Sequence, residues 1–279
     1  MVLILLASLL MPYACGQRSD LRAAMAAAGN GNFGPASRLK LTTADVPELA
    51  GYLRDKEEAV RREALVLLAG IGGAPACEAL APALTDASAD IRERASRALH
   101  KCPAGVRGIE EPLRQSIRMG NTAAASLLLL GQFRDQANVE FLKQQLNNKQ
   151  PVKLEDWSQP VPSGLAAAVA AVSAGVEGAR RRLTDGLGPL NEAEFLVSVL
   201  PDISDRGALP GLLNLLDDER AVALGVPSGA MPQRRVCDLA VDAFVARLGL
   251  KAPFPLNAGG RYSGEERKQV RQMAARAGF

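Results

Sequence analysis

Apolar residues recur with a helical period through residues 45–147, and they do so in paired segments. Leu49 and Leu53 are spaced i,i+4, which predicts a first short helix. The stripe of a second helix follows and consists of Val60, Ala64, Leu67, Leu68 and Ile71. Because both segments are amphipathic, we expect each pair to form a helical hairpin.

This pair of segments repeats after 31 residues. The matched positions are Leu49 and Leu80, Leu53 and Leu84, Asp55 and Asp86, Val60 and Ile91, Arg61 and Arg92, Ala64 and Ala95, and Leu68 and Leu99. The phase continues a third time, with a slip of two residues that places Leu113 and Ile117 on the first helix. The second helix of that unit is expected to begin near Asn121 and Thr122, which are good N-cap types. The fixed period predicts a repeat architecture.

The repeat resembles the short bacterial form of the HEAT-repeat family, in which a Leu-rich helix is followed by a turn Asp and by an Arg that opens the second helix. Asp55 and Arg61, and 31 residues later Asp86 and Arg92, carry this resemblance within residues 45–147. It implies an all-α fold, an α-solenoid of stacked antiparallel helix pairs in a right-handed superhelix, with a concave face used for protein binding. Stacking agrees with the physics, because one amphipathic pair cannot bury its own apolar stripe.

The repeated Asp and Arg residues are interpreted as structural, because the resemblance implies that they bond along the stack as a ladder. Positions that differ between repeats are better candidates for contact with a partner. Three such positions on the second helices are Arg62, Arg94 and Arg97. We expect them to be exposed, and a charged face that is merely solvated is the favoured alternative to a binding site.

An uninterrupted apolar run, Val2 to Met11, precedes the repeats. It is too short to span a bilayer, which takes roughly 20 residues, but it suits the apolar core of a signal peptide. We expect a signal peptide over residues 1–14, with Cys15 as the lipidated first residue of a bacterial lipoprotein. The small residues on either side of Cys15 resemble a lipobox, whereas Pro12 and Tyr13 depart from it. The alternative is a buried first helix.

Residues 15–44 are mostly small and polar, which predicts a tether with a short Ala-rich helix near residues 21–28. After the regular repeats, residues 148–164 carry three prolines and the only Trp of the chain, and we interpret them as an inserted loop. Trp157 either anchors a partner, a role in which Trp is enriched, or pins the loop onto the solenoid, which we favour. Residues 165–279 return to helical spacing without the 31-residue register, which predicts divergent helical repeats and a final capping helix.

Composition agrees with a helical chain that carries no catalytic machinery. There are 47 alanines and 40 leucines among 279 residues, and aromatics make up only 4%. His100 is the single histidine, which excludes a metal site with several His ligands, and no phosphate-binding glycine loop occurs. We therefore expect no enzyme activity, no cofactor, no metal and no small-molecule substrate. A net charge of +3 is too small to argue for nucleic acid, and the basic triplet Arg180 to Arg182 is interpreted as a solvated helix face.

Cys77 and Cys102 are expected at the same edge of the second helix pair, and two interpretations stay open. A disulfide is plausible in an oxidising compartment if the Cα atoms come within about 7 Å. Neighbouring helix axes are about 8–10 Å apart, which favours two small apolar residues buried in the core.

Together these features predict an exported, lipid-anchored scaffold on the periplasmic side of a bacterial cell envelope. It would contact the membrane through its anchor and bind an unidentified protein partner through the solenoid face. Two alternatives remain. Some short-HEAT relatives are bilin lyases or lyase-associated subunits, so the resemblance also implies a bilin-lyase-like protein, although export argues against that chemistry. The other alternative is a cytoplasmic HEAT adaptor whose apolar N-terminus is a buried helix.

Overall fold

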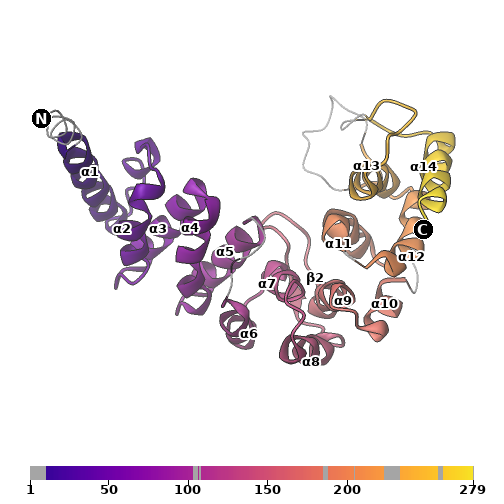
Figure 1. The fold of residues 1–279 in the computed structure, drawn as a ribbon, viewed down its shortest axis with the longest axis horizontal. Coiled ribbons are helices and arrows are strands. Elements are labelled where there is room, and N and C mark those ends of the chain that lie inside the picture. The colour runs from indigo at the N-terminus through magenta and orange to yellow at the C-terminus, as the bar shows by residue number, and fades with distance from the viewer. Residues whose placement is uncertain are drawn as a thin grey trace, which may run out of the picture. The chain divides into compact units, whose positions relative to one another are not determined.

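The computed structural model describes residues 11–278, apart from residues 103–105, 107, 185–187, 204, 223–232 and 257–259. Most of the expected signal peptide therefore lies outside the described residues. Within them the chain is mostly helical, with fourteen α-helices and one pair of two-residue strands, so the all-α prediction is confirmed. The chain divides into two compact units, Met1–Asn121 and Thr122–Phe279, and each is described by itself (Figure 1).

The first unit contains the first two predicted repeats and the first helix of the third. Its α-helices are α1 (Met11–Gly29), α2 (Val46–Tyr52), α3 (Glu58–Ile71), α4 (Gly73–Leu80), α5 (Ala89–His100) and α6 (Glu110–Arg118). Its 3₁₀ helices are η1 (Ala36–Arg38), η2 (Thr43–Asp45) and η3 (Ala81–Thr85). The predicted pairs correspond to α2 with α3, and to α4 and η3 with α5.

The two regular pairs stack on each other. Helix α2 contacts α3 within the first pair, and between the pairs α2 contacts α4 while α3 contacts α5 (Figure 1). The buried seam consists of Leu49, Leu53, Ala64, Leu68, Leu80, Leu84, Ile91, Ala95 and Leu99. These are residues that match at the 31-residue offset. The hydrophobic period therefore placed the core of these two pairs correctly.

The first helix of the second pair differs from a regular α-helix. Helix α4 ends at Leu80, and the chain continues as the 3₁₀ helix η3, in which Pro82 occupies the first turn. Proline has no N–H to donate and its ring clashes with the preceding turn, so an α-helix cannot continue through it unchanged. Leu84 nonetheless stays buried, because the 3₁₀ turn keeps it on the inner face.

The predicted ladder has one complete rung. Arg61 donates from Nε and Nη2 to the two carboxylate oxygens of Asp86, at 2.7 and 3.0 Å. Its Nη1 donates to the Asp55 carbonyl at 2.9 Å. Both side chains of the rung are largely buried, and the hydrogen bond that Arg61 donates to Asp86 raises the pKa of the Arg61 guanidinium. A bidentate, buried pair of this kind links consecutive repeats with defined geometry.

The third repeat has no Asp at the equivalent turn, so Arg92 donates to a backbone carbonyl in place of a carboxylate. Arg92 Nη1 donates to the Asp86 carbonyl at 2.8 Å, as Arg61 does to Asp55, but its Nη2 donates to the Met119 carbonyl at 2.9 Å. The N-cap residue of α7 is Ala123 and not Asn121, whose Nδ2 donates to the Ser96 and Ser116 hydroxyls at 2.9 and 2.8 Å. The following helix begins only at Ala124.

Residues 15–44 are not a tether throughout, because their first half, residues 15–29, belongs to α1, which packs on α3. The predicted helix near residues 21–28 is present within α1. Its buried positions have helical spacing and are Leu21, Ala24, Met25 and Ala28. Among the described residues, no helix has the length and apolar character needed to cross a membrane.

The structure joins Cys77 of α4 and Cys102 as a disulfide, with Cα atoms 6.1 Å apart. The disulfide interpretation is therefore the one that the structure supports, although the usual distance between helix axes favours two unlinked cysteines. Cys102 lies beyond His100, the last residue of α5. The chain after the helix can therefore come closer to α4 than the distance between two packed helix axes. Cys237 is a free, buried thiol, and burial raises its pKa.

The second unit contains α7 (Ala124–Leu130), α8 (Gln136–Gln145), α9 (Ser163–Ser173), α10 (Glu177–Thr184), α11 (Leu190–Val199), α12 (Leu209–Leu212), α13 (Val236–Leu248) and α14 (Gly264–Arg276). Its 3₁₀ helices are η4 (Leu200–Asp202), η5 (Arg206–Ala208) and η6 (Leu213–Asp217). Helix α9 is central, since α7, α8 and α10 all contact it. The run of alanines in α9 allows these neighbours to approach closely. Gly131 is one example, because a Cβ atom at this position would be only 2.6 Å from the backbone of Ala170.

Residues 148–164, the predicted inserted loop, contain a short β-hairpin. Strands β1 (Pro151–Val152) and β2 (Val161–Pro162) pair antiparallel, with Val152 opposite Val161. Lys153 extends the pairing, because its N–H donates to the Thr122 carbonyl and its own carbonyl accepts from Ala124, both at 2.8 Å. Prolines fit here because they lie at the ends of very short strands.

We expect the Arg61–Asp86 rung to stabilise the first unit more than any exposed ion pair on it. Asp86→Ala leaves a largely buried guanidinium without its partner, so the free energy of unfolding should fall by about 3 kcal/mol. Asp90→Ala is the matched control, because Asp90 also pairs with arginines but is 40% exposed, and its loss should cost less than about 1 kcal/mol. Urea unfolding measures both, and equal losses would contradict a structural role for the rung.

The disulfide is expected to contribute about 3 kcal/mol, since it closes a loop with a sequence separation of 25 residues. In a Cys237→Ala background, a reducing agent should lower the urea midpoint of unfolding by a corresponding amount. The control is the same chain with Cys77→Ala and Cys102→Ala, which should not respond to the reducing agent. A midpoint unchanged by reduction in the first protein would show that the two thiols are not bonded.

Candidate functional site

The tip of the hairpin is held by one serine. Ser158 Oγ accepts hydrogen bonds from the backbone N–H groups of Leu154 and Glu155, both at 3.1 Å, and donates to the Glu155 carbonyl at 2.9 Å. A hydroxyl that bonds three backbone groups fixes a turn locally. The turn leaves Trp157 outside the hairpin, with 73% of its surface exposed.

Helix α11 supports the hairpin from the other side. Asn191 Nδ2 donates to the Pro160 carbonyl at 2.6 Å, which ties the outgoing strand to the first turn of the helix. Ser198 Oγ donates to the Glu194 carbonyl at 2.9 Å within the helix. Phe195 lies on the same helix and is buried, so the hairpin tip rests beside a rigid, apolar element.

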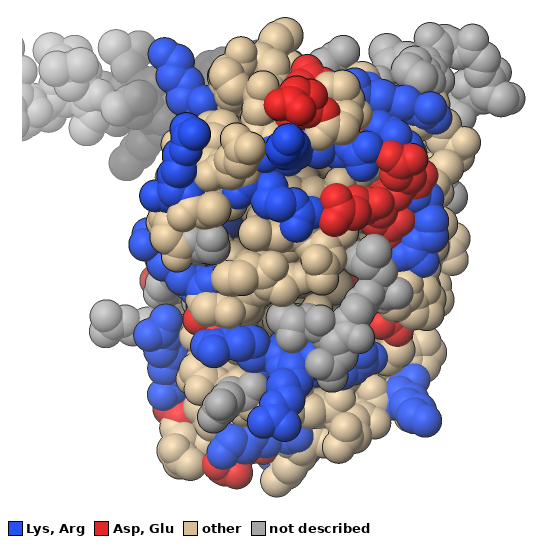
Figure 2. All heavy atoms as spheres, turned by 90° about the vertical axis from the view of Figure 1, so that its right-hand side faces the viewer, with Lys and Arg blue, Asp and Glu red and all other residues tan. Residues whose placement is uncertain are grey.

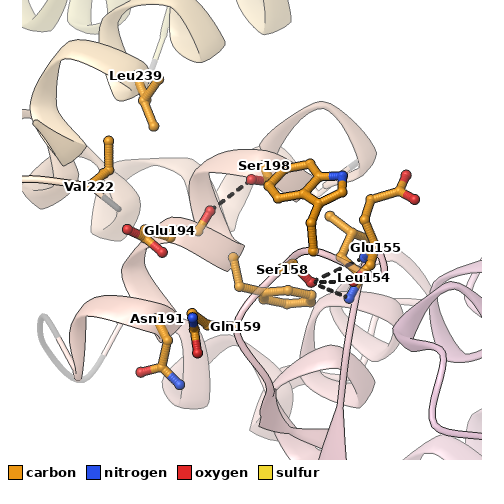
Figure 3. A pocket seen from close by; sticks show the side chains of 11 residues that line it. Leu154, Glu155, Ser158, Gln159, Asn191, Glu194, Ser198, Val222 and Leu239 are labelled. Carbon is orange, nitrogen blue, oxygen red and sulfur yellow. Dashed lines mark hydrogen bonds between the residues drawn. The ribbon is translucent and has the colours of Figure 1, made fainter. Parts of the chain in front are cut away.

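A pocket of about 260 Å³ lies between the hairpin tip, α11 and α13 (Figure 3). We refer to it as the hairpin pocket. Its lining residues are Leu154, Glu155, Trp157, Ser158, Gln159, Asn191, Glu194, Phe195, Ser198, Val222 and Leu239. All of them belong to the second unit, although they come from four separate stretches of the sequence.

The hairpin pocket combines apolar walls with negative charge. Nearly half of the described residues that line it are aliphatic or aromatic, and the charged ones among them are Glu155 and Glu194. Figure 3 shows the Glu155 and Glu194 carboxylates well separated, with that of Glu155 turned away from the other labelled side chains. None of the described residues that line it is Lys or Arg, although the whole chain carries a net charge of +3. The pocket therefore has the opposite sign to the chain.

The exposure of Trp157 corrects the interpretation that it pins the hairpin onto the helices. The hairpin holds itself through Ser158 and Asn191, so it does not need the indole as an anchor. The remaining interpretation, contact with a partner, agrees with the exposed position. Sequence reasoning missed the rest of the pocket, because Phe195 and Leu239 have the spacing of ordinary helix core residues.

Arg62 and Arg94 come together at one carboxylate and not at an open site. Arg94 Nε donates to the Asp90 carboxylate at 2.9 Å, and Arg62 Nε forms an ion pair with the same carboxylate at 2.9 Å. Burial alone would raise the pKa of Asp90, but the hydrogen bonds and charges of Arg94 and Arg62 outweigh burial and lower it. Arg62 also pairs with Glu58 at 2.6 Å. These arginines form a local charge network on neighbouring second helices.

Arg97 is buried, which corrects the expectation that it is an exposed contact position. Its guanidinium lies 3.5 Å from the Glu93 carboxylate, one turn earlier on α5. A long Arg side chain can lie along its own helix and cover apolar surface instead of extending into water. Glu63 is buried as well, and burial raises the pKa of its carboxyl group.

Two further candidate residues lie on helices. Cys15 lies inside α1, and its side chain lies outside what the structure describes. His100 is the last residue of α5, where a cation would complement the helix dipole. In the described part of the chain, no group of three or more His, Cys, Asp or Glu residues is arranged to hold a metal ion.

The basic triplet on α10 is partly neutralised by neighbouring acids. Arg180 pairs with Asp205 at 2.8 Å, and Arg182 lies 3.8 Å from Glu192. The face that carries α10, α12 and α14 has many Lys and Arg side chains, with Asp and Glu side chains among them (Figure 2). This arrangement agrees with a solvated helix face.

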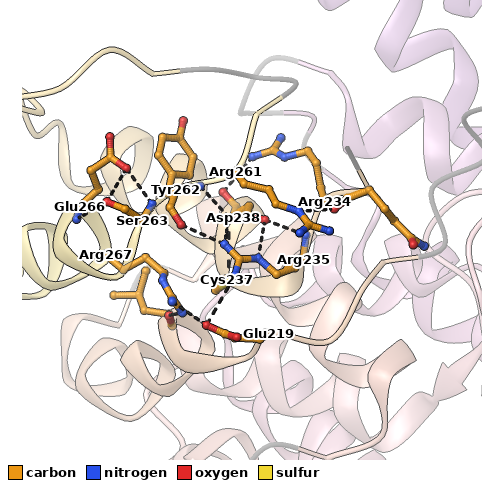
Figure 4. A network of polar contacts seen from close by, with 12 residues as sticks. Glu219, Arg234, Arg235, Cys237, Asp238, Arg261, Tyr262, Ser263, Glu266 and Arg267 are labelled. Carbon is orange, nitrogen blue, oxygen red and sulfur yellow. Dashed lines mark hydrogen bonds and ion pairs between the residues drawn. The ribbon is translucent and has the colours of Figure 1, made fainter. Parts of the chain in front are cut away.

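A buried polar network joins α13 to the chain before α14 (Figure 4). The Asp238 carboxylate accepts from the Arg235 guanidinium at 3.0 and 3.1 Å and from the backbone N–H groups of Tyr262 and Arg235, at 2.9 and 2.8 Å. Burial alone would raise its pKa, but these hydrogen bonds outweigh burial and lower it. Because every partner is internal, we assign the network a structural role.

The comparisons with known proteins leave the function open. No protein-family model and no curated protein matches the chain. A solved structure of human deoxyhypusine hydroxylase in complex with glycerol is similar over 84% of this chain and 96% of that chain, at 18% sequence identity and a TM-score of 0.32. A likeness with so low a TM-score carries no argument about this chain.

The Asp238 network gives a pH-dependent prediction. A carboxylate whose pKa is lower in the folded protein stabilises it above the unfolded value of 3.8, and this contribution is lost as the pH falls through the folded pKa. Asp238→Asn should therefore lower the free energy of unfolding by about 2 kcal/mol at pH 7. The difference from the parent protein should shrink below about pH 4. Asp217→Asn, at a 69% exposed side chain, is the control and should show little change at either pH.

Proposed function

We propose that this chain is an exported, lipid-anchored scaffold that binds a protein partner and catalyses no reaction. The observation that carries the proposal is the hairpin pocket, where an ordered hairpin presents the only Trp of the chain, 73% exposed, beside apolar walls. Trp is strongly enriched among the residues that dominate binding energy at protein interfaces. Ser158 and Asn191 hold the hairpin in place, so little ordering is needed when a partner binds.

The proposal includes the architecture implied by the HEAT resemblance, an α-solenoid of stacked antiparallel helix pairs in a right-handed superhelix. Contacts of α2 with α4 and of α3 with α5 support stacking of the two regular pairs. The Arg61–Asp86 rung supports it further, because it links equivalent turns of consecutive repeats. The hairpin would then add a local binding feature to a repetitive surface.

Export to the bacterial envelope is supported by two features. A disulfide such as Cys77–Cys102 persists in oxidising compartments and is rare in the reducing cytosol. The apolar run before Cys15 has the length of a signal-peptide core. The several acyl chains of a bacterial lipoprotein would hold the protein at the membrane, which a single chain does only marginally.

One observation favours the alternative of a cytoplasmic adaptor with a buried N-terminal helix. Helix α1 runs without a break from Met11 through Cys15, it packs on α3, and Leu21 and Met25 in its later turns are buried. An N-terminal helix that is part of the folded domain would be continuous and partly buried in this way. The chemical state of Cys15 separates the two proposals.

The test uses full-length protein expressed in its native host and separated into membrane and soluble fractions. We expect the membrane form to begin at an acylated Cys15 in mass spectrometry, and a Cys15→Ser variant to leave the membrane fraction. Full-length, unacylated chain in the cytosol would contradict export and favour the adaptor.

The same membrane fraction tests the scaffold function by cross-linking and affinity purification. We expect one partner to be recovered reproducibly with the parent chain and lost with Trp157→Ala. Val66→Ala is the matched control, because Val66 is also an exposed apolar residue, lies on α3 and is distant in sequence from the hairpin pocket. Absence of any reproducible partner would count against a scaffold.

A further inference from the structure

We propose that α14 is a detachable helix, which opens about Tyr262 while the rest of the second unit stays folded, and that the surface it uncovers binds the α14 of a second copy of this chain. This inference goes beyond the proposed function, because it concerns how copies of the chain associate and not the partner at the hairpin pocket. It follows from the contacts that hold α14, the firm attachment of the residue before it, and the charge of the surface beneath it.

Two arginines, one helical turn apart on α14, bind it to the 3₁₀ helix η6 and to the residues that follow η6. Arg267 donates from Nη1 to a backbone carbonyl at 3.1 Å and from Nη2 to a carboxylate at 2.6 Å. Arg271 Nη2 donates to a second carbonyl at 3.1 Å and to a second carboxylate at 2.6 Å. We call these acceptors the α14 seat, and they are the carbonyls of Leu216 and Leu213 and the carboxylates of Glu219 and Asp217. The seat therefore fits a helix that carries two arginines four residues apart.

These contacts hold α14 less firmly than a core helix is held. Of the thirteen residues of α14, only Val270 and Ala274 are buried, and neither has a large side chain. The seat carboxylates belong to Glu219 and Asp217, whose side chains are 60% and 69% exposed, so salt screens both ion pairs. Exposed ion pairs contribute little to stability. Opening of α14 alone should therefore cost much less free energy than unfolding of the second unit.

Tyr262, two residues before α14, is held more firmly. Its backbone N–H donates to the Asp238 carboxylate at 2.9 Å, its carbonyl accepts from the Arg235 guanidinium at 2.9 Å, and only 3% of its surface is exposed (Figure 4). Ser263 and Glu266 bond each other in the capping box of α14, so they belong to the helix and would move with it. The chain can therefore bend between Tyr262 and Ser263 without loss of either set of bonds.

A second copy of the chain supplies a helix that fits the seat. Once two copies have opened, the α14 of each can form the same hydrogen bonds and ion pairs on the seat of the other, because the exchanged helix is identical. Such an exchange keeps the number of contacts constant, so it costs mainly the freedom lost on association. A helix without basic residues would leave two carboxylates and two carbonyls of the seat without donors, which is unfavourable.

Cys237 provides a chemical reporter for the opening of α14. It is a free thiol on α13 and is fully buried. Burial raises the pKa of this thiol, and the charges of Arg267 and Glu219 also act on it, which places it beside the contact between α14 and its seat (Figure 4). The thiol reagent N-ethylmaleimide should therefore reach Cys237 only when α14 is open, and mass spectrometry locates the label in the sequence.

In the parent protein, hydrogen exchange should show the amides of α14 exchanging faster than those of α13. Higher salt should speed the labelling of Cys237, because it screens the ion pairs of the seat. Both measurements use the full chain without a substitution, so they do not depend on how a variant folds.

A double variant, Arg267→Gln with Arg271→Gln, tests the two arginines. It should raise the rate of Cys237 labelling at least about tenfold, while α13 keeps its protection from hydrogen exchange. Lys268→Gln with Arg276→Gln is the matched control, because it removes the same charge from exposed positions of the same helix. The control should be labelled at the rate of the parent.

Two full-length variants test binding by a second copy. The first carries Arg267→Glu and Arg271→Glu, which remove the cations of its α14, and the second carries Asp217→Arg and Glu219→Arg, which remove the anions of its seat. Each alone should be monomeric and rapidly labelled. In an equal mixture, the unchanged α14 of the second variant can occupy the unchanged seat of the first. We therefore expect a dimer by light scattering and at least about tenfold slower labelling of Cys237 in the first variant.

The first variant is isotopically labelled, so that mass spectrometry distinguishes its peptides from those of the second. The control mixture uses a second variant that also carries Arg267→Glu and Arg271→Glu, so that no unchanged α14 is present. This mixture should stay monomeric, and Cys237 should remain rapidly labelled in both chains.

Loss of protection in α13 together with α14, or labelling of the Arg267→Gln, Arg271→Gln variant at the control rate, would overturn the detachable helix. A test mixture that stays monomeric, or in which Cys237 of the first variant stays as reactive as in that variant alone, would overturn binding by a second copy. Neither result bears on recovery of a partner through Trp157, so failure of this inference and failure of the scaffold function are distinguishable.

Discussion

A single amphipathic helix pair cannot bury both of its apolar stripes, so every pair of this chain must be covered by another element. In the first unit this requirement is met by stacking α2 with α4 and α3 with α5, and by covering α3 with α1. Stacking alone would leave the pairs able to slide, because apolar contacts are not directional. The Arg61–Asp86 pair removes that freedom, since its two hydrogen bonds form in only one register.

The same hydrogen bonds form at the two turns that contain an Asp of the repeat, Asp55 and Asp86. Asp55 and Asp86 each accept a hydrogen bond from the N–H two residues later, at 2.8 and 2.7 Å. The arginine that follows six residues after each Asp bonds its carbonyl, at 2.9 and 2.8 Å. Short local motifs of one Asp and one Arg therefore determine the register of the helix pairs. The third repeat lacks the Asp, and there Arg92 donates to the backbone carbonyl of Met119 instead.

Periodic features were predictable from sequence, and non-local ones were not. The 31-residue period placed the helix pairs and their core, because helix burial depends on spacing that the sequence carries directly. The hairpin was not predictable, since its strands are two residues long and Lys153 pairs with the distant Thr122 and Ala124. The pocket was not predictable either, because Leu154, Phe195 and Leu239 meet only after the second unit has folded.

Charge distinguishes the hairpin pocket from the rest of the surface. Elsewhere arginines meet acidic partners of the same unit, as Arg61 does with Asp86 and Arg180 with Asp205. At the pocket Trp157 lies beside apolar walls, and none of the described residues that line it is Lys or Arg. Charges that are already paired within a unit have little free energy left to offer a partner. An exposed aromatic side chain on a short hairpin keeps its apolar surface available to a partner, and partner recognition is therefore best sought at Trp157 and not along the charged helix faces.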